Sequence, residues 1–137
     1  MKTVLAASVL AASLVACTQG GSGNELAPDL EVGRETFIAR CAACHGGNGQ
    51  GASAPALHDV ASTFARCEGQ IEWIALGSER YRAEIGPAFG DAGKEITGVM
   101  PEFGSSLTEI EIAQVAAFER HQFGGVSAEV ALDDCGL

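Results

Sequence analysis

Five consecutive residues, Cys41-Ala42-Ala43-Cys44-His45, constrain this chain more than any other segment. Two thiols separated by two residues and followed directly by an imidazole are typical of covalent haem attachment, in which the thiols add to the two vinyl groups of the porphyrin. The adjacent imidazole then serves as the proximal ligand of the iron. The motif therefore predicts one haem c, attached through Cys41 and Cys44 and ligated by His45.

Two other kinds of site share part of this spacing. A thiol–disulfide redox pair needs a thiolate of low pKa in a thioredoxin-like setting, and a zinc site needs two further ligands nearby. No strand–helix–strand pattern surrounds the motif, and Cys67 and Cys135 are isolated in the sequence. Haem attachment is the favoured interpretation, and the other two stay open on the pattern alone.

The first 16 residues are typical of a secretory signal peptide. A short basic start precedes an apolar run over residues 3–15, which is too short for a bilayer because spanning takes about 20 apolar residues. The four residues that end at Cys17 resemble the lipobox of bacterial lipoproteins, whose cysteine becomes the lipidated first residue. We expect an exported, membrane-anchored protein in the periplasm or on the outer cell surface, with a flexible tether over residues 17–30.

Met100 is the candidate for the second axial ligand, because it is the only methionine outside the expected leader. It lies in the glycine-flanked segment 98–104, where Pro101 cannot continue a helix and pushes the preceding residue toward an extended conformation. A core methionine usually fills gaps on a helix, so ligation of iron better explains one held on a stiff loop. The alternative is a loop methionine that packs under a turn.

Together these features resemble the class I cytochromes c, over about residues 31–123. In that family a glycine and a phenylalanine one helical turn apart precede the first haem cysteine, as Gly33, Phe37 and Cys41 do at intervals of four. This spacing places the three on one helix face, where the glycine lets a crossing helix approach closely. The resemblance implies an all-α fold, with three or more helices around one haem and with crossing N- and C-terminal helices.

The crossing helix is expected over residues 108–121. Thr108 is a suitable N-cap, acidic residues occupy the first turn, and Val115 and Phe118 match the family's aliphatic and aromatic pair. The apolar residues of this segment form no single stripe, so we expect burial on more than one side.

A middle helix is expected over residues 70–76. It would end at Gly77, since glycine is common just past a helix C-terminus. A long loop over residues 78–97 would then lead toward Met100.

The resemblance also implies which residues surround the haem. A proline carbonyl accepts the Nδ1–H of the ligand imidazole in such cytochromes, and Pro55, ten residues after His45, occupies the corresponding place. Phe103 would lie against the haem edge. The candidates for contact with the haem propionates are Trp73, Tyr81, Arg80 and Arg82.

The other histidines are expected to be solvated. His58 follows a turn-rich loop, and His121 lies in the last turn of a helix, where a cation is favoured. Either one could ligate iron if Met100 did not.

Cys67 and Cys135 are expected to form a disulfide, because an exported chain occupies an oxidising compartment. The bond would tie a C-terminal extension, residues 126–137, to a cytochrome domain over residues 31–125. Closing this loop of 68 residues would contribute about 4 kcal/mol on the chain-entropy account.

A haem with His45 and Met100 as axial ligands is six-coordinate, so it leaves no open position for oxygen or a small-molecule substrate. The sequence shows no paired acid–base carboxylates and no nucleophile–base arrangement. We expect a carrier of single electrons rather than an enzyme. The alternatives are a haem subunit of a larger oxidase or dehydrogenase, and a ligand-binding haem sensor or enzyme in which Met100 dissociates.

Composition limits the partners. Eight basic and 18 acidic residues give a formal charge of −10, which excludes nucleic acid and a polybasic membrane patch. We expect redox proteins with basic docking surfaces, and contact with a membrane through lipid on Cys17. The alternative is that the acidity only maintains solubility.

Overall fold

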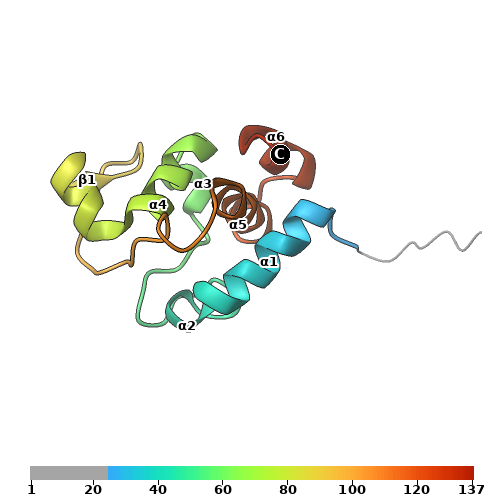
Figure 1. Cartoon of the computed structure of the whole chain (residues 1–137), viewed down its shortest axis with the longest axis horizontal. Coiled ribbons are helices and arrows are strands. Elements are labelled where there is room, and N and C mark those ends of the chain that lie inside the picture. Colours follow the sequence, from blue (N-terminus) through green and yellow to red (C-terminus); the bar gives the residue numbers. More distant parts are fainter. Residues whose placement is uncertain (1–24) are drawn as a thin grey trace, which may run out of the picture.

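The computed structural model describes residues 25–137, so the expected leader, most of the tether and Cys17 lie outside the described residues. Six helices and one antiparallel hairpin follow one another (Figure 1). Their bounds are α1 Pro28–Arg40, α2 Ala42–His45, α3 Val60–Thr63, α4 Cys67–Glu84, β1 Ala88–Phe89, β2 Lys94–Glu95, α5 Glu109–Gln122 and α6 Ala128–Asp134. The expected all-α class is confirmed. No helix within residues 25–137 is long and apolar enough to cross a membrane.

Helix α1 begins earlier than the sequence suggested. Pro28 occupies its start and Asp29 lies in its first turn, both favourable at a helix N-terminus. Leu30 is fully buried. Residues 28–30, which were expected to belong to the tether, are therefore part of the packed helix α1.

Helices α1 and α5 cross at Gly33. A Cβ atom there would overlap the carbonyl oxygen of Gln114 and lie 2.8 Å from Cβ of Phe118, so only glycine permits this approach. The Phe37 ring packs 5.7 Å from that of Phe118 and 5.0 Å from that of Phe123, measured between centroids. The crossing of the first helix with α5, expected from the resemblance, is confirmed.

Helix α5 forms the centre of the core. Thr108 caps its start, as predicted, and the structure adds that Glu111 completes a reciprocal capping box with it. All residues from 112 to 120 are buried. In Figure 1, α5 is seen nearly end-on, with α1 crossing it and with α4 and α6 also packed against it. The expected burial on more than one side follows from these three neighbours.

Helix α4 is longer than the expected helix over residues 70–76. Its backbone leaves the helical conformation at Gly77, with φ 64° and ψ 174°, and resumes it to Glu84. The prediction of a loop throughout residues 78–97 is therefore wrong, since this stretch holds two further helical turns and the β1–β2 hairpin. Within α4, Tyr81 of the second part meets Trp73 of the first part edge-on at 5.1 Å, and Arg82 donates to the Ile96 carbonyl outside the helix at 3.2 Å.

The C-terminal segment folds as α6, which Ser127 caps. A disulfide joins Cys67 at the start of α4 to Cys135 just after α6, with Cα atoms 5.1 Å apart. Asp134 accepts from the backbone N–H of Cys67 at 2.9 Å and pairs with Arg120 at 2.9 Å. The segment is therefore anchored to both α4 and α5.

Candidate haem attachment site

The Cys41–His45 motif forms a single helical turn directly after α1. The amide of Cys41 donates to the carbonyl of Phe37 at 2.8 Å, and the amides of Cys44 and His45 both donate to the carbonyl of Cys41. Cys41 points into the core and is buried, whereas Cys44 is exposed. Neither thiol is in a disulfide, so both sulfur atoms can form thioether bonds.

The environment of Cys41 disfavours thiolate chemistry. Burial raises the pKa of its thiol to about 12, and the nearby carboxyl group of Glu119 and the thiol of Cys44 act in the same direction. A redox-active or zinc-binding cysteine needs an accessible thiolate. Within residues 25–137 no cluster of three His, Cys, Asp or Glu side chains suits a metal ion. These observations support neither a thiol–disulfide redox pair nor a zinc site.

His45 is oriented for ligation through one nitrogen. Its Nδ1 lies 2.8 Å from the carbonyl oxygen of Pro55, which can only accept, so Nδ1 carries the proton and Nε2 is left with its lone pair. The intervening loop returns to the motif, where Ala54 N–H donates to the Cys44 carbonyl at 3.0 Å and Gly51 N–H donates to the His45 carbonyl at 2.7 Å. A free Nε2 beside two thiols is the donor set that haem c requires.

The Met100 backbone is clamped to the break in α4. Ser78, buried at 1% exposure, accepts from Met100 N–H through Oγ at 2.9 Å and donates its own N–H to the Met100 carbonyl at 2.9 Å. The Met100 side chain is half-buried against the core. Ser78 could not be identified from the sequence, because its partner lies 22 residues away and no local pattern indicates that the two residues meet.

Gly77 makes room for this clamp. A Cβ atom there would lie 2.7 Å from the Met100 carbonyl oxygen and 2.6 Å from the Pro101 carbonyl carbon. The loop continues along α4, where Phe103 N–H donates to the Ile74 carbonyl at 3.2 Å. The glycine predicted to end the helix thus also admits the Met100 loop.

The structure brings Trp73 and Tyr81 together, at 5.1 Å between ring centroids, and gives the two expected arginines other partners. Trp73 stacks on Phe89 at 4.3 Å, and burial raises the pKa of Tyr81. Arg80 binds Glu84 at 2.7 Å on the surface, and Arg82 donates to the Ile96 carbonyl at 3.2 Å. Both guanidinium groups thus have partners within the protein, and their contact with the haem propionates stays a prediction.

The remaining expected residues lie as follows. Phe103 is half-buried against the core, and the Pro55 ring is exposed. His58 is exposed, and His121 places Nδ1 2.9 Å from the Val126 carbonyl. Neither histidine contacts the motif through a hydrogen bond.

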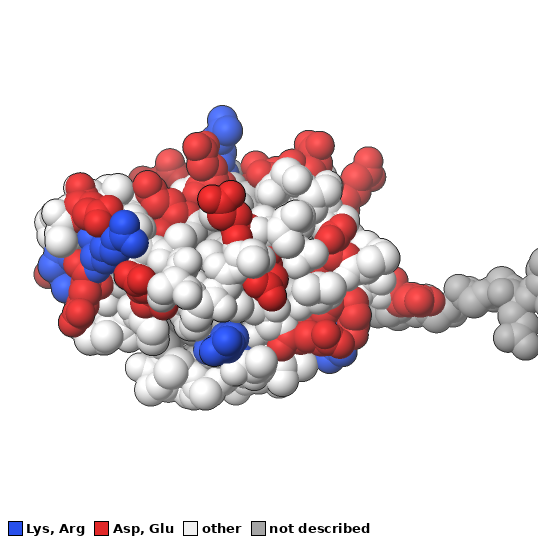
Figure 2. Space-filling view, in the orientation of Figure 1, with Lys and Arg blue, Asp and Glu red and all other residues white. Residues whose placement is uncertain are grey.

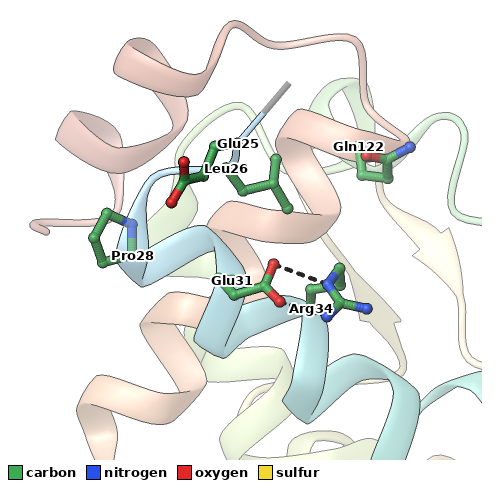
Figure 3. A pocket seen from close by; sticks show the side chains of 6 residues that line it. All are labelled: Glu25, Leu26, Pro28, Glu31, Arg34 and Gln122. Carbon is green, nitrogen blue, oxygen red and sulfur yellow. Dashed lines mark hydrogen bonds and ion pairs between the residues drawn. The ribbon is translucent and has the colours of Figure 1, made fainter. Parts of the chain in front are cut away.

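A surface hollow at the start of α1 is separate from this site. Figure 3 shows its lining, in which the only interaction drawn is the ion pair of Glu31 with Arg34. The lining residues are Glu25, Leu26, Pro28, Glu31, Arg34 and Gln122. None of them belongs to the motif, so the hollow is not the candidate site.

Comparison with known proteins gives a family and two relatives. Residues 28–118 match the family model described as cytochrome c oxidase, cbb3-type, subunit III. Cytochrome c6 of Synechococcus sp. is 31% identical over 86% of this chain and 90% of its own length. Cytochrome c6 of Tetradesmus obliquus is 34% identical over 71% of this chain and 94% of its own length.

Two solved structures are also similar. The c-type cytochrome XoxG of Methylobacterium extorquens AM1 is 22% identical, with a TM-score of 0.51 over 78% of this chain and 67% of that one, which supports the fold. Cytochrome cL of Hyphomicrobium denitrificans is 23% identical, with a TM-score of 0.46 over 68% of this chain. The present chain spans less than half, 46%, of that protein's length.

Proposed function

Because the chain belongs to the family of cytochrome c oxidase, cbb3-type, subunit III, and is thus a mono-haem electron-carrier cytochrome with covalently attached haem c, we propose that His45 and Met100 are its axial ligands. We further propose that it carries single electrons between redox proteins at the outer face of a membrane. The haem supplies the one-electron chemistry when bound. The hydrogen bond from His45 Nδ1–H to Pro55 carries the proposal, because it aims the free Nε2 away from the loop.

The chain's own residues would hold the iron in one coordination state. Cys41 and Cys44 would form the thioether bonds, and Pro55 would keep the His45 ring in one tautomer. Ser78 would restrain the Met100 backbone. The Met100 sulfur would then keep its position when the iron changes between the oxidised and reduced states. Trp73, Tyr81 and Phe103 supply apolar or aromatic surface that would exclude water.

Attachment and ligation are tested together on purified holoprotein. We expect haem stain to remain with the polypeptide on a denaturing gel, and the ferric protein to show the weak sulfur-to-iron absorption band. Met100→Ala should abolish that band and admit cyanide, while Cys44→Ser should leave a single thioether bond. A band that survives in Met100→Ala would contradict methionine ligation.

The acidic surface supports partners with basic docking patches. Figure 2 shows Asp and Glu side chains scattered over the top, the middle and the right of the visible face, with several Lys and Arg groups at the end where Figure 1 places β1 and single ones elsewhere. Complementary charge would accelerate encounter and would be screened by salt. We expect electron transfer to a basic acceptor protein to slow as ionic strength rises, and a rate independent of salt would favour acidity as a device for solubility alone.

Membrane anchoring rests on the sequence before residue 25. We propose that the leader is removed after residue 16 and that Cys17 is lipidated, which would confine the cytochrome to an extracytoplasmic membrane surface. Mass analysis of the membrane fraction should find a diacylated N-terminal Cys17. Cys17→Ala should release haem-loaded protein into the soluble fraction, and unchanged membrane retention would contradict the anchor.

A second candidate function is that of a haem subunit held permanently in a larger oxidase. The name of the matching family model favours it. Co-purification through two columns in mild detergent distinguishes the two, because a mobile carrier should elute alone and a subunit should bring a stoichiometric partner.

A further inference from the structure

Helix α5 places a carboxyl group inside the core. Glu119 is 5% exposed and follows the buried, apolar residues 115–118. Its only side-chain hydrogen-bond partner among the described residues is Gln70 of α4, whose Nε2 donates to Oε2 at 2.8 Å. A buried carboxylate normally requires a cation or several donors, so this environment calls for an explanation.

No cation compensates Glu119 within residues 25–137. Arg120, the next residue, directs one Nη to the Phe64 carbonyl at 2.9 Å and the other to Asp134 at 2.9 Å. Helix α3 presents no charged or titratable side chain to α5. Among the other packed elements, Gln70 of α4 binds Glu119 and Cys41 just after α1 is influenced by it, while Asp134 of α6 is already paired with Arg120. The exposed Arg40 at the end of α1 acts on the Cys41 thiol and is not among the groups that shift the pKa of Glu119.

Gln70 shows which form of the acid fits. Its Oε1 is buried and has no donor, although its Nε2 is satisfied. A buried acceptor left without a donor costs about 1–3 kcal/mol. Protonated Glu119 has one O–H to donate, so an acid–amide pair would satisfy both side chains with two hydrogen bonds. Burial also raises the pKa of Glu119 to about 8.

Glu119 lies within electrostatic reach of the haem attachment point. Its carboxyl group is the second cause, after burial, of the raised pKa of Cys41. An electron added to the haem brings one more negative charge, which disfavours a nearby carboxylate in a dry core. The acid should therefore bind its proton more tightly in the reduced protein than in the oxidised one.

We propose that Glu119 and Gln70 form a proton-binding site that takes up one proton when this cytochrome accepts one electron. The electron comes from the reducing partner, the proton comes from solvent and binds the Glu119 carboxylate, and the net charge of the protein is unchanged. Oxidation releases both. The site rests on haem attachment at Cys41 and does not require Met100 to be the second ligand.

The test is the midpoint potential of the purified holoprotein as a function of pH. In the wild type the potential should fall near pH 8, with a slope approaching tenfold in the equilibrium constant per pH unit, or about 59 mV for one electron. Glu119→Gln, which is always neutral, should remove that slope and keep the higher potential. Glu109→Gln, on the exposed start of the same helix, is the matched control and should keep the slope.

A measurement on the wild type alone protects the test against a misfolded variant. The reduced-minus-oxidised infrared spectrum should contain a carboxylic acid C=O band that shifts in D₂O. A wild-type potential independent of pH, or the absence of this band, would overturn the proposal. A slope retained in folded Glu119→Gln would also overturn it, because the proton would then bind another group such as a haem propionate. The ferric absorption spectrum reports Met100 ligation separately.

Discussion

Two buried polar residues lie beside the candidate site and outside the Cys41–His45 motif. Ser78 holds the backbone of Met100, and Glu119 lies near Cys41 with Gln70 as its partner. Each is a polar side chain among apolar neighbours, and each has one specific hydrogen-bond partner. Their substitution should therefore alter the behaviour of the haem iron more than the fold.

Ser78→Ala should loosen the Met100 loop. The variant removes the Oγ that accepts from Met100 N–H, and an amide left without a partner in a partly buried position costs about 1–3 kcal/mol. We expect a weaker sulfur-to-iron band and tighter cyanide binding in the ferric protein. Ser106→Ala is the control, because Ser106 is exposed on the following loop. Identical cyanide affinity in wild type and Ser78→Ala would contradict the role.

The stability of the protein should depend on pH through Glu119. Its pKa is about 8 in the folded protein against 4.5 as the ordinary value, so between these values the folded state binds more protons than the unfolded state. The free energy of unfolding should then be greatest at the acidic end of this window and fall as pH rises from about 4.5 to about 8.

Denaturant unfolding at several pH values, with the haem held in one redox state, measures this slope. Glu119→Gln should flatten it, and Glu109→Gln should not. Glu31 and Glu111, whose pKa values are lowered by hydrogen bonds from Arg34 and from the Thr108 backbone, act below this window and do not obscure it. Equal slopes in wild type and Glu119→Gln would show that the carboxyl group titrates alike in both states.

At the scale of helices, close approach decides the architecture. Gly33 lets α1 lie against α5, and Gly77 lets the Met100 loop lie against α4. In both places a glycine in or beside a helix is unfavourable by local propensity, by about 1 kcal/mol against alanine. Backbone contact across elements offsets that cost.

Gly33→Ala should destabilise the protein even though alanine is the better helix former. The added Cβ would overlap the Gln114 carbonyl, and overpacking costs about 1–3 kcal/mol or more, which exceeds the gain in propensity. Thermal unfolding should show a lower midpoint. Gly47→Ala is the control, since nothing lies within 4 Å of its added Cβ. Equal melting temperatures for the two variants would show that α1 can shift without penalty.

Across the whole molecule, the C-terminal helix α6 is joined to the middle of the chain. The disulfide closes a separation of 68 residues between α4 and α6, and Asp134 adds a hydrogen bond and an ion pair at the same place. This tie joins α6 to the start of α4, ten residues before the break at Gly77 where the Met100 loop packs, so its loss should affect stability before ligation.

Replacing Cys67 and Cys135 together by alanine should lower the free energy of unfolding by up to about 4 kcal/mol, because the unfolded chain regains the entropy of an open loop. Denaturant unfolding of holoprotein measures the difference. The ferric absorption spectrum of the folded variant should stay that of the wild type. A free energy of unfolding unchanged by the double substitution would contradict the stabilising role.

The sequence by itself determined the features that depend on neighbouring residues. The two thiols and the imidazole lie within one helical turn, the Thr108 cap and Glu111 lie three residues apart, and Gly33 precedes Phe37 by one turn. Such signals arise from local backbone geometry, which is why the haem motif and the start of α5 could be predicted from neighbouring residues, whereas the crossing of the helices was implied by the resemblance to class I cytochromes c.

Only the tertiary structure decided which distant groups meet. Ser78 binds Met100 across 22 residues, Gln70 binds Glu119 across 49, and α4 resumes after Gly77 although the glycine signals a helix end. Each outcome depends on the packing of one element against another. Local propensities of about 1 kcal/mol per residue are too small to oppose burial and hydrogen bonding that the rest of the fold supplies.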